Sequence, residues 1–486
     1  MALLNLKNSN RMKKTVKLFI VGVMTLAFFS AKAQNVSPVD FMRYNPYQMN
    51  ANTATDLPYQ SVMSLVIGNI GLDVQNTTMR YDNFFDFDAQ GRPATLNLRQ
   101  LANSLNEDNY VGFDANVDLF TLYKRLKKGV ITINYGVKAQ GDMRYNDGLF
   151  NLLGYGNSAF VGDDNPAHID LDINAMGYQE LAVGYQWNVT EQLSLGGKGK
   201  LLFGLANMTT DAFDVNLFTD PDSYALRLQE NIAMKASMPN VIYVDDAGQL
   251  KANGPFSMGE LFRNPGFGID FAAEYRFDEQ FSAVAAVRDL GFIHWGKNNL
   301  GMTGQVNDVG QFYDNGDFLF TGLNVDELQR IASDDWYRER FLDTLQQYFQ
   351  VEFSPLEKYN TALNTCLMLR GNYDLNAQNR FSAQVQGRFL GSGFRPSMTL
   401  AYCGSFFNNL NVCATYTMMP HSYDNVGLGI SAMIETCNIY LTTNNLIGLF
   451  RPMNMSGFNA QVGIVFNLWI PERRYIDESG MPDYME

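Results

Sequence analysis

The sequence predicts an all-β fold, a transmembrane antiparallel β-barrel of about 14 strands with an N-terminal plug segment and long extracellular loops. Three observations predict it. Short runs of alternating apolar and polar residues recur along the chain, an export signal precedes them, and long and short connections alternate between the runs. The barrel is expected to span residues 61–469.

The last run, at 458–469, has the most regular alternation. One parity carries Phe458, Ala460, Val462, Ile464, Phe466 and Leu468, and the other carries mostly polar residues. A period of two indicates a strand with one apolar face. A run of about 10 residues is long enough to cross a membrane as a tilted strand.

Similar runs fill the rest of the chain. The first is 62–74, where Val66, Ile70, Leu72 and Val74 are predicted to share one face. The next six are 113–123, 131–140, 181–187, 193–205, 267–277 and 281–295, and seven more lie between 361 and 469. A short helix is expected at 96–105 in the first long connection.

The connection lengths support this strand count. Every long connection is odd-numbered, so all of them fall on one side of the barrel. Outer-membrane barrels place long loops outside and short turns in the periplasm, whereas a soluble β-sandwich has no reason to show this order. After the N-terminus no stretch of 18 continuous apolar residues occurs, which argues against a helical membrane protein.

Residues 1–33 have the form of a signal peptide. A basic region (Lys13, Lys14 and Lys17) precedes the apolar core at 18–29, and Ala31-Lys32-Ala33 has the form of a cleavage site. The mature chain is expected to begin at Gln34 or Asn35, and translation to start at Met1 or Met12. The predicted location is the bacterial outer membrane.

The segment 34–60 is the candidate plug. A barrel of about 14 strands is too wide for side chains alone to fill, so its lumen holds water, a plug, or both. The segment contains Asn45-Pro46, has no charge runs and ends where the first strand starts; the alternative is a disordered periplasmic tail. Residues 470–486 are expected to form a periplasmic C-terminal tail.

Eight charged residues fall on the polar parity of their runs and are the candidate lumen-lining residues. They are Lys138, Lys198, Lys200, Asp270, Glu274, Arg276, Arg370 and Arg388. They could line a solute path, or they could form the polar network that any barrel lumen requires.

Two of the four cysteines have suggestive positions. Cys403 and Cys413 are equally far from Asn408 at a presumed turn, so they could face each other across a hairpin and form a disulfide. Two thiols that merely lie close together are the alternative.

Three segments carry a resemblance to a known family: 101–125, 180–208 and 266–296. They resemble a family of uncharacterised outer-membrane barrel proteins of Gram-negative bacteria, defined by a domain of unknown function. That family in turn resembles the long-chain fatty-acid and aromatic-hydrocarbon transporters. The resemblance implies fourteen strands and an N-terminal hatch with an Asn-Pro motif, for which Asn45-Pro46 is the match.

The leading functional hypothesis is a transporter or channel for small hydrophobic or amphipathic solutes. The alternative is a structural or assembly component of an outer-membrane complex that binds a protein partner through its extracellular loops, where 323–350 has apolar residues at helical spacing. No catalytic, cofactor or metal motif occurs in the sequence, so an enzyme is not expected. The formal net charge of −14 makes nucleic acid a poor partner, and the expected surroundings are outer-membrane lipid.

Overall fold

The structure is a computed structural model of the 486-residue chain. It describes residues 36–57, 62–78, 80–87, 93–222, 226–238, 242–244, 250–252, 258–296, 299–306, 352–407, 409–419, 422–450 and 457–468. The predicted signal peptide, the predicted C-terminal tail and the stretch 323–350, whose apolar residues have helical spacing, lie outside these residues.

Fourteen antiparallel strands close into a barrel, which confirms the predicted fold and strand count. The ring closes because β1 pairs with both β22 and β4. In ring order the strands are β1 (Met63–Asn76), β4 (Asn109–Leu126), β5 (Gly129–Tyr145), β6 (Ala167–Asn188), β7 (Leu193–Thr219), β11 (Asn264–Arg276), β12 (Phe281–Trp295), β16 (Cys366–Asp374), β17 (Asn379–Leu390), β18 (Gly393–Phe406), β19 (Leu410–Met419), β20 (Ser422–Ile434), β21 (Cys437–Thr443) and β22 (Gly457–Leu468).

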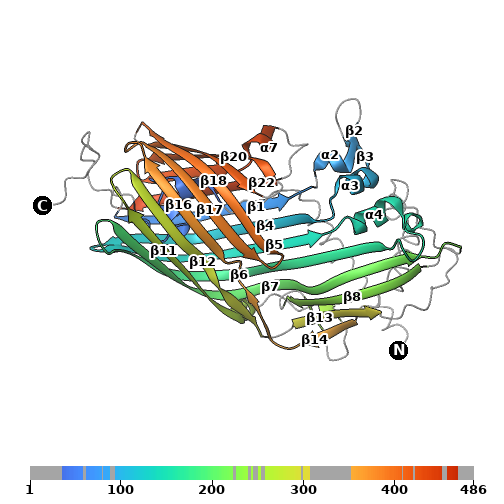
Figure 1. Ribbon diagram of the computed structural model, residues 1–486. Helices are drawn as coiled ribbons and strands as arrows, with labels where there is room; N and C mark the ends of the chain where they lie inside the picture. The colour runs from blue at the N-terminus through green and yellow to red at the C-terminus, as the bar shows by residue number, and fades with distance from the viewer. Residues whose placement is uncertain are drawn as a thin grey trace.

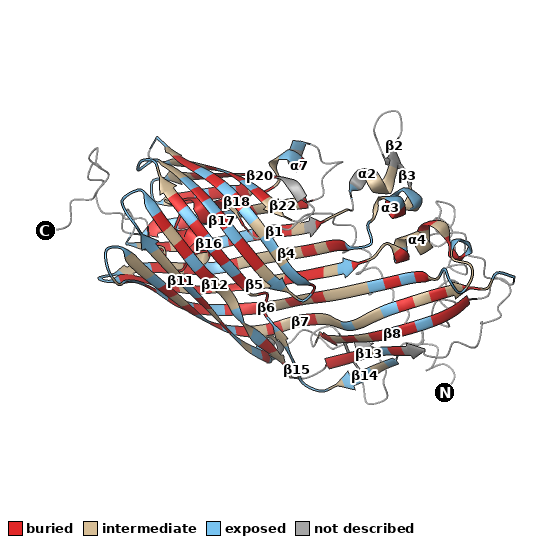
Figure 2. Cartoon of the chain, viewed as in Figure 1, coloured by how far each residue is buried: buried red, intermediate tan, exposed pale blue. Residues whose placement is uncertain are grey.

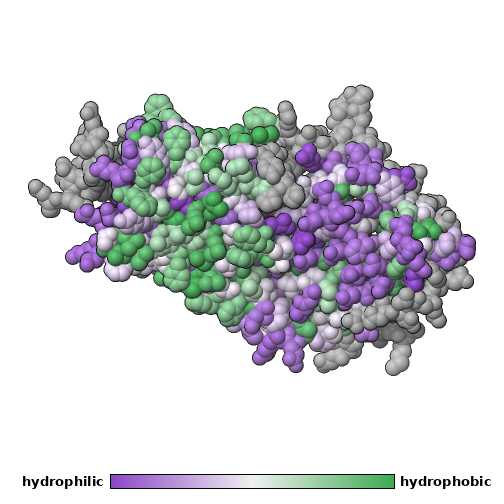
Figure 3. Space-filling view, in the orientation of Figure 1, coloured by the Kyte–Doolittle hydropathy of each residue, from purple (hydrophilic) through white to green (hydrophobic). Residues whose placement is uncertain are grey.

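The outer surface of the barrel is an apolar band. Buried and exposed residues alternate along the strands (Figure 2), as a strand with two different faces requires. The exposed positions are largely aliphatic and aromatic, for example Leu369, Leu441 and Phe271. Figure 3 shows these side chains as a belt over the barrel wall, with hydrophilic side chains beyond it. This is the surface that a transmembrane barrel presents to lipid.

The face predicted for Val66 on β1 is wrong. Val66 was expected to share a face with Ile70 and Leu72, yet it is 0% exposed and faces the lumen, while Ile67 is 46% exposed. The reason is a bulge: the β1–β22 register shifts between Ile67 and Ile70, and Gly68 there has φ 66°. One extra residue at a bulge reverses the parity of everything before it.

All long connections between the strands lie at one end of the barrel, which we call the loop end. Six short turns lie at the opposite end, which we call the turn end. At the loop end the sheet continues past the barrel through β6, β7 and β8 (Leu226–Ser237), as seen in Figure 1. β8 pairs with β13 (Asn299–Val306), which pairs with β14 (Glu352–Leu356); β15 (Tyr359–Ala362) pairs with β12. An apolar cluster that includes Ile169, Val215 and Ile232 stabilises this extension.

Smaller elements lie in the connections at the loop end. They are α2 (Tyr81–Phe84), β2 (Phe85–Phe87), β3 (Pro93–Leu96), α3 (Leu98–Ser104), α4 (Gly148–Tyr155), η3 (Asn157–Ala159), β9 (Ile242–Val244), β10 (Leu250–Ala252), η4 (Met258–Phe262) and α7 (Leu446–Phe450). The position of α3 confirms the helix expected at 96–105. None of the helices in the described ranges has the length and apolar character needed to cross a membrane.

Candidate functional site in the barrel lumen

Residues 36–57, which we call the lumen segment, pack against the inner wall of the barrel. The segment forms two short 3₁₀ helices, η1 (Pro38–Phe41) and η2 (Pro46–Asn50). Proline at the first position of each suits a helix start, because its fixed φ fits and its missing N–H needs no partner. Before η2, the buried Asn45 side chain accepts a hydrogen bond from the Tyr47 backbone N–H at 3.0 Å. Asn45-Pro46 therefore starts a local turn.

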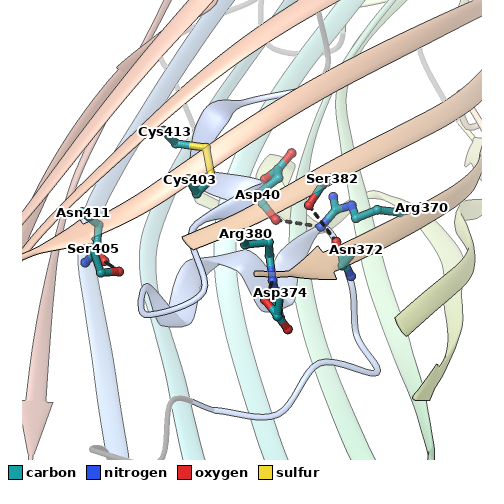
Figure 4. The surroundings of a disulfide bond; sticks show 10 residues. All are labelled: Asp40, Arg370, Asn372, Asp374, Arg380, Ser382, Cys403, Ser405, Asn411 and Cys413. Carbon is teal, nitrogen blue, oxygen red and sulfur yellow. Dashed lines mark hydrogen bonds and ion pairs between the residues drawn. A yellow bond between two sulfur atoms is a disulfide. The ribbon is translucent and has the colours of Figure 1, made fainter. Parts of the chain in front are cut away.

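Apolar side chains of the lumen segment pack against wall residues. Val39, Phe41 and Met42 are buried in one cluster with the wall residues Val130 and Tyr440. Figure 4 shows the segment running between the strands, with the Arg370 guanidinium donating to the carbonyl oxygen of Asp40 at 2.8 Å. The same guanidinium lies 4.4 Å from the centre of the Phe41 ring.

Polar contacts hold the C-terminal half of the lumen segment near the turn end. Arg125 donates two hydrogen bonds from Nη1 to the two carboxylate oxygens of Asp56, both at 2.9 Å. Asn52 and Thr55 donate to Glu274 Oε2 at 2.9 and 3.0 Å. Charge-assisted bonds of this kind contribute more than neutral ones, so this half is held firmly.

The bulge in β1 brings Asn69 into a buried hydrogen-bonded hub. Tyr47 Oη donates to Asp118 Oδ2 at 2.7 Å, and Asn69 Nδ2 lies 2.7 Å from Tyr47 Oη and 2.9 Å from Asp118 Oδ2. On its other side Asn69 accepts from Tyr440 at 2.7 Å and from Gln461 at 3.0 Å. The hub joins the lumen segment to four strands, and sequence reasoning missed it because alternation gives the face of Asn69 but not its partners across the lumen.

The backbone of the lumen segment touches the wall at Gly196 of β7. A Cβ added there would lie 2.0 Å from the carbonyl oxygen of Thr53 and 2.6 Å from the backbone nitrogen of Ala54. Such distances are impossible for a real side chain, so glycine is required while the segment is docked. Gly199 on the same strand faces outward, and a Cβ there has no atom within 4 Å.

Three of the predicted lumen residues meet in a buried cluster of ion pairs, and a fourth, Lys198, lies beside it. Lys200 Nζ lies 2.7 Å from Asp270, 2.6 Å from Asp289 and 3.8 Å from Glu180. Lys138 Nζ lies 2.8 Å from Glu180, and Lys198 lies on the same wall without joining an ion pair. Sequence reasoning missed Glu180, which precedes its run, and Asp289, whose φ of 56° marks a local break in β12.

The other predicted lumen residues are dispersed. Glu274 holds the lumen segment, and Arg370 bonds both the segment and Gln384. Arg388 reaches across the lumen to Asp114 at 3.4 Å. Arg276 lies exposed at the turn end of β11 and contacts none of these groups in the described part of the chain.

A cavity of about 180 Å³ lies between the lumen segment and the wall. Its lining is mostly polar. The charged lining residues are Asp40, Asp73, Asp114, Asp118, Lys138, Glu180, Lys198, Lys200, Asp270, Arg288, Asp289 and Arg388. Two of its lining residues are aliphatic, Ala51 and Leu72, and the Leu72 side chain is 40% exposed on the outer face of β1.

Cys403 and Cys413 form a disulfide, which decides between the two alternatives left by the sequence. They are directly paired across β18 and β19, with a Cα–Cα distance of 4.1 Å. Figure 4 shows the bond facing the lumen segment, and both cysteines belong to the cluster around Phe41 and Met42. Cys366 and Cys437 are free thiols.

Comparisons with known proteins identify the family and the fold neighbours. The model of a family of unknown function, DUF5723, matches residues 54–444, well over half of the chain, which confirms the predicted resemblance to such a family. No curated protein matches.

Three solved structures illustrate the fold neighbours. The Pseudomonas putida toluene transporter TodX overlaps 90% of this chain and 95% of its own, with 9% identity and a TM-score of 0.37. A Pseudomonas aeruginosa FadL homologue overlaps 90% and 94%, with 9% identity and a TM-score of 0.41. The deltaS2S3 mutant of the monoaromatic hydrocarbon channel TodX overlaps 87% and 93%, with 10% identity and a TM-score of 0.41. Likenesses this distant carry no argument about function.

Proposed function

The chain belongs to the DUF5723 family, and we propose that it is an outer-membrane channel for small solutes in which the lumen segment acts as a plug. One observation carries the proposal: residues 36–57 contact strands on many sides of the lumen, including β4, β11, β16 and β21. A barrel that serves only as an anchor has no need for a segment held in this way.

The membrane location follows from the barrel itself. A closed antiparallel barrel with an even number of strands and an apolar outer band is the architecture of outer-membrane proteins, because only a closed barrel pairs every backbone group within lipid. By the same rule the loop end faces outward and the turn end faces the periplasm. The sequence-based signal peptide agrees with this location.

The solute class is narrowed by the cavity. The sequence predicts hydrophobic or amphipathic solutes, and the side chains that offer apolar surface in the lining are Ala51 and the rings of Tyr47 and Tyr178. Moving an apolar molecule beside charged side chains gains nothing from burial, whereas polar groups on an amphipathic solute find partners. We therefore favour amphipathic solutes.

The second candidate function, an assembly component, is favoured by no observation on the described residues. The apolar helical stretch that suggested it, 323–350, lies outside them.

Conductance in planar bilayers tests the plug with one matched pair of substitutions. Gly196→Ala forces the backbone at Thr53 away from β7, whereas Gly199→Ala adds the same methyl group to the same strand where space is open. We expect the native chain and Gly199→Ala to be nearly closed and Gly196→Ala to conduct, with deletion of 36–57 conducting most.

Two results would count against the proposal. A native chain with the steady conductance of an open pore would mean that the segment does not close the lumen. If neither Gly196→Ala nor the deletion conducts, although the heat-dependent gel shift of barrels shows that both are folded, the lumen carries no solute path.

A further inference from the structure

We propose that the end of the β17–β18 hairpin, residues 389–397, is a gate over the cavity at the loop end of the barrel. We call these residues the hairpin tip. The inference rests on the proposed function, since the gate controls entry to the same lumen, but it concerns a closure separate from the lumen segment. Three features support it: the hairpin tip leaves the sheet, it crosses the lumen, and it lies directly above the cavity.

The hairpin tip has almost no neighbours within the sheet. Among the described residues, β16 pairs with β17 only as far as Arg388, and β18 pairs with β19 only from Met398 onward. Between these positions the two strands pair with each other through a turn at 391–392. One backbone bond joins the tip to the chain beside it, from the Phe389 N–H to the Thr365 carbonyl at 2.9 Å. An isolated two-stranded hairpin is marginally stable in water, so the tip is able to bend unless other contacts hold it.

A hydrogen bond across the lumen holds the hairpin tip. The backbone N–H of Ser392 donates to Asp142 Oδ2 on β5 at 3.0 Å, and both residues are buried. In the ring β6, β7, β11, β12 and β16 lie between β5 and β17, so this bond joins opposite walls. Figure 1 shows β5 and β6 continuing beyond the end of the hairpin.

The turn of the hairpin also touches β6. A Cβ added at Gly391 would lie 2.4 Å from both Cβ and Nδ2 of Asn174. Because a Cβ is fixed to its backbone, a change of side-chain rotamer cannot relieve this contact. Glycine is therefore required at position 391 while the tip is docked.

The charges of the hairpin tip favour its docked position. Arg388 and Arg395 are directly paired across β17 and β18, and like charges opposite each other destabilise a strand pair. On the opposite wall Arg388 lies 3.4 Å from Asp114, and the Arg395 guanidinium lies 4.2 Å from the centre of the Tyr110 ring. Docking offsets a repulsion that the undocked hairpin retains.

The docked tip lies over the loop end of the cavity. Gln140 lines the cavity, and Asp142, which holds the tip, is two residues nearer to the loop end on the same face of β5. Asp114 and Arg388 line the cavity as well. The tip closes this end only while it is docked, so the lumen segment is what keeps the native chain closed when the tip opens.

Thiol labelling of the detergent-solubilised full chain tests this inference. Gln140→Cys places a thiol in the cavity, and Cys366→Ser and Cys437→Ser remove the two free thiols of the described chain. Detergent covers the apolar band, so a hydrophilic maleimide reaches this thiol through the ends of the barrel. We expect slow labelling with the native tip. Gly391→Ala and Asp142→Ala should each accelerate it about 10-fold or more, because the first pushes the tip away and the second removes a charged hydrogen-bond acceptor.

Two matched variants serve as controls in the same background. Asp142→Asn keeps an oxygen that accepts from the Ser392 N–H, so it should retain most of the protection. Gly371→Ala adds a methyl group on the neighbouring β16, where a Cβ meets no atom within 4 Å, so it should label at the native rate. Folding of every variant is checked by its heat-dependent gel shift.

The inference is overturned if the thiol in the cavity labels rapidly with the native tip. It is also overturned if Gly391→Ala or Asp142→Ala folds and labels at the native rate. These outcomes are separate from the plug test, because labelling requires no conduction. A chain that responds to the tip substitutions but never conducts would contradict the channel and not the gate, and a conducting chain whose labelling ignores them would do the reverse.

Discussion

At the scale of the residue, ionisation of Asp40 makes the docking of the lumen segment depend on pH. Burial raises the pKa of its carboxyl above the usual value of 3.8, and the positive charges of Arg288 and Arg370, together with the Ser37 N–H, lower it less than burial raises it. The docked segment therefore holds this proton more tightly than the released segment. Docking is strongest below the usual pKa of 3.8, weakens as the pH rises from there to the raised pKa, and is constant above it.

Substitution of Asp40 tests this linkage. Asp40→Asn keeps the shape and removes the ionisation, so we expect docking at neutral pH to strengthen and its pH dependence between pH 3.8 and neutral pH to flatten. Protease cleavage of the lumen segment, measured across this range, reports docking. The role assigned to Asp40 is contradicted if the cleavage rate of the native chain does not change with pH. It is also contradicted if the cleavage rate of Asp40→Asn changes with pH as steeply as that of the native chain.

At the scale of the element, the bulge in β1 depends on Gly68. Its φ of 66° belongs to the left-handed region, and a Cβ there would meet no atom within 4 Å, so the cost of a side chain is purely conformational. Gly68→Ala should lower the unfolding free energy by about 1–2 kcal/mol. Urea unfolding followed by gel shift measures it, with Gly199→Ala on β7 as the control.

If Gly68→Ala were neutral, the left-handed conformation would not be required at this position. A larger loss, together with release of the lumen segment, would indicate that the bulge also maintains the hub around Asn69, Tyr47 and Asp118.

At the scale of the whole molecule, the apolar belt determines how the barrel sits in the bilayer. Leu369, 64% exposed in the middle of β16, should contact the lipid core, whereas Leu375 lies in the turn that follows the strand. We expect Leu369→Arg to cost about 2–4 kcal/mol and Leu375→Arg about 0–1 kcal/mol. Folding into lipid vesicles across a urea series measures both, and equal costs would mean that the belt is misplaced.

The sequence alone determined the strands, their number and the end at which the long loops lie. Each of these follows from local alternation and from connection length, which short stretches of chain carry by themselves. The alternation also placed Lys138, Lys198, Lys200 and Asp270 on the lumen side, where the structure has them.

Only the tertiary structure decided which of these charges are matched. Lys198 and Lys200 are two residues apart on one face, yet Lys200 contacts three carboxylates and Lys198 an amide. The acids of β6, β11 and β12 lie within 4 Å of the Lys200 ammonium and not of the Lys198 ammonium. The inward directions of Val66 and Asp289 depend on breaks in regular alternation, and the Tyr47–Asp118 bond depends on where the lumen segment docks. Alternation of apolar and polar residues with a period of two is a property of a single strand. Bulges and contacts across the lumen arise from the closure of the barrel around the lumen segment.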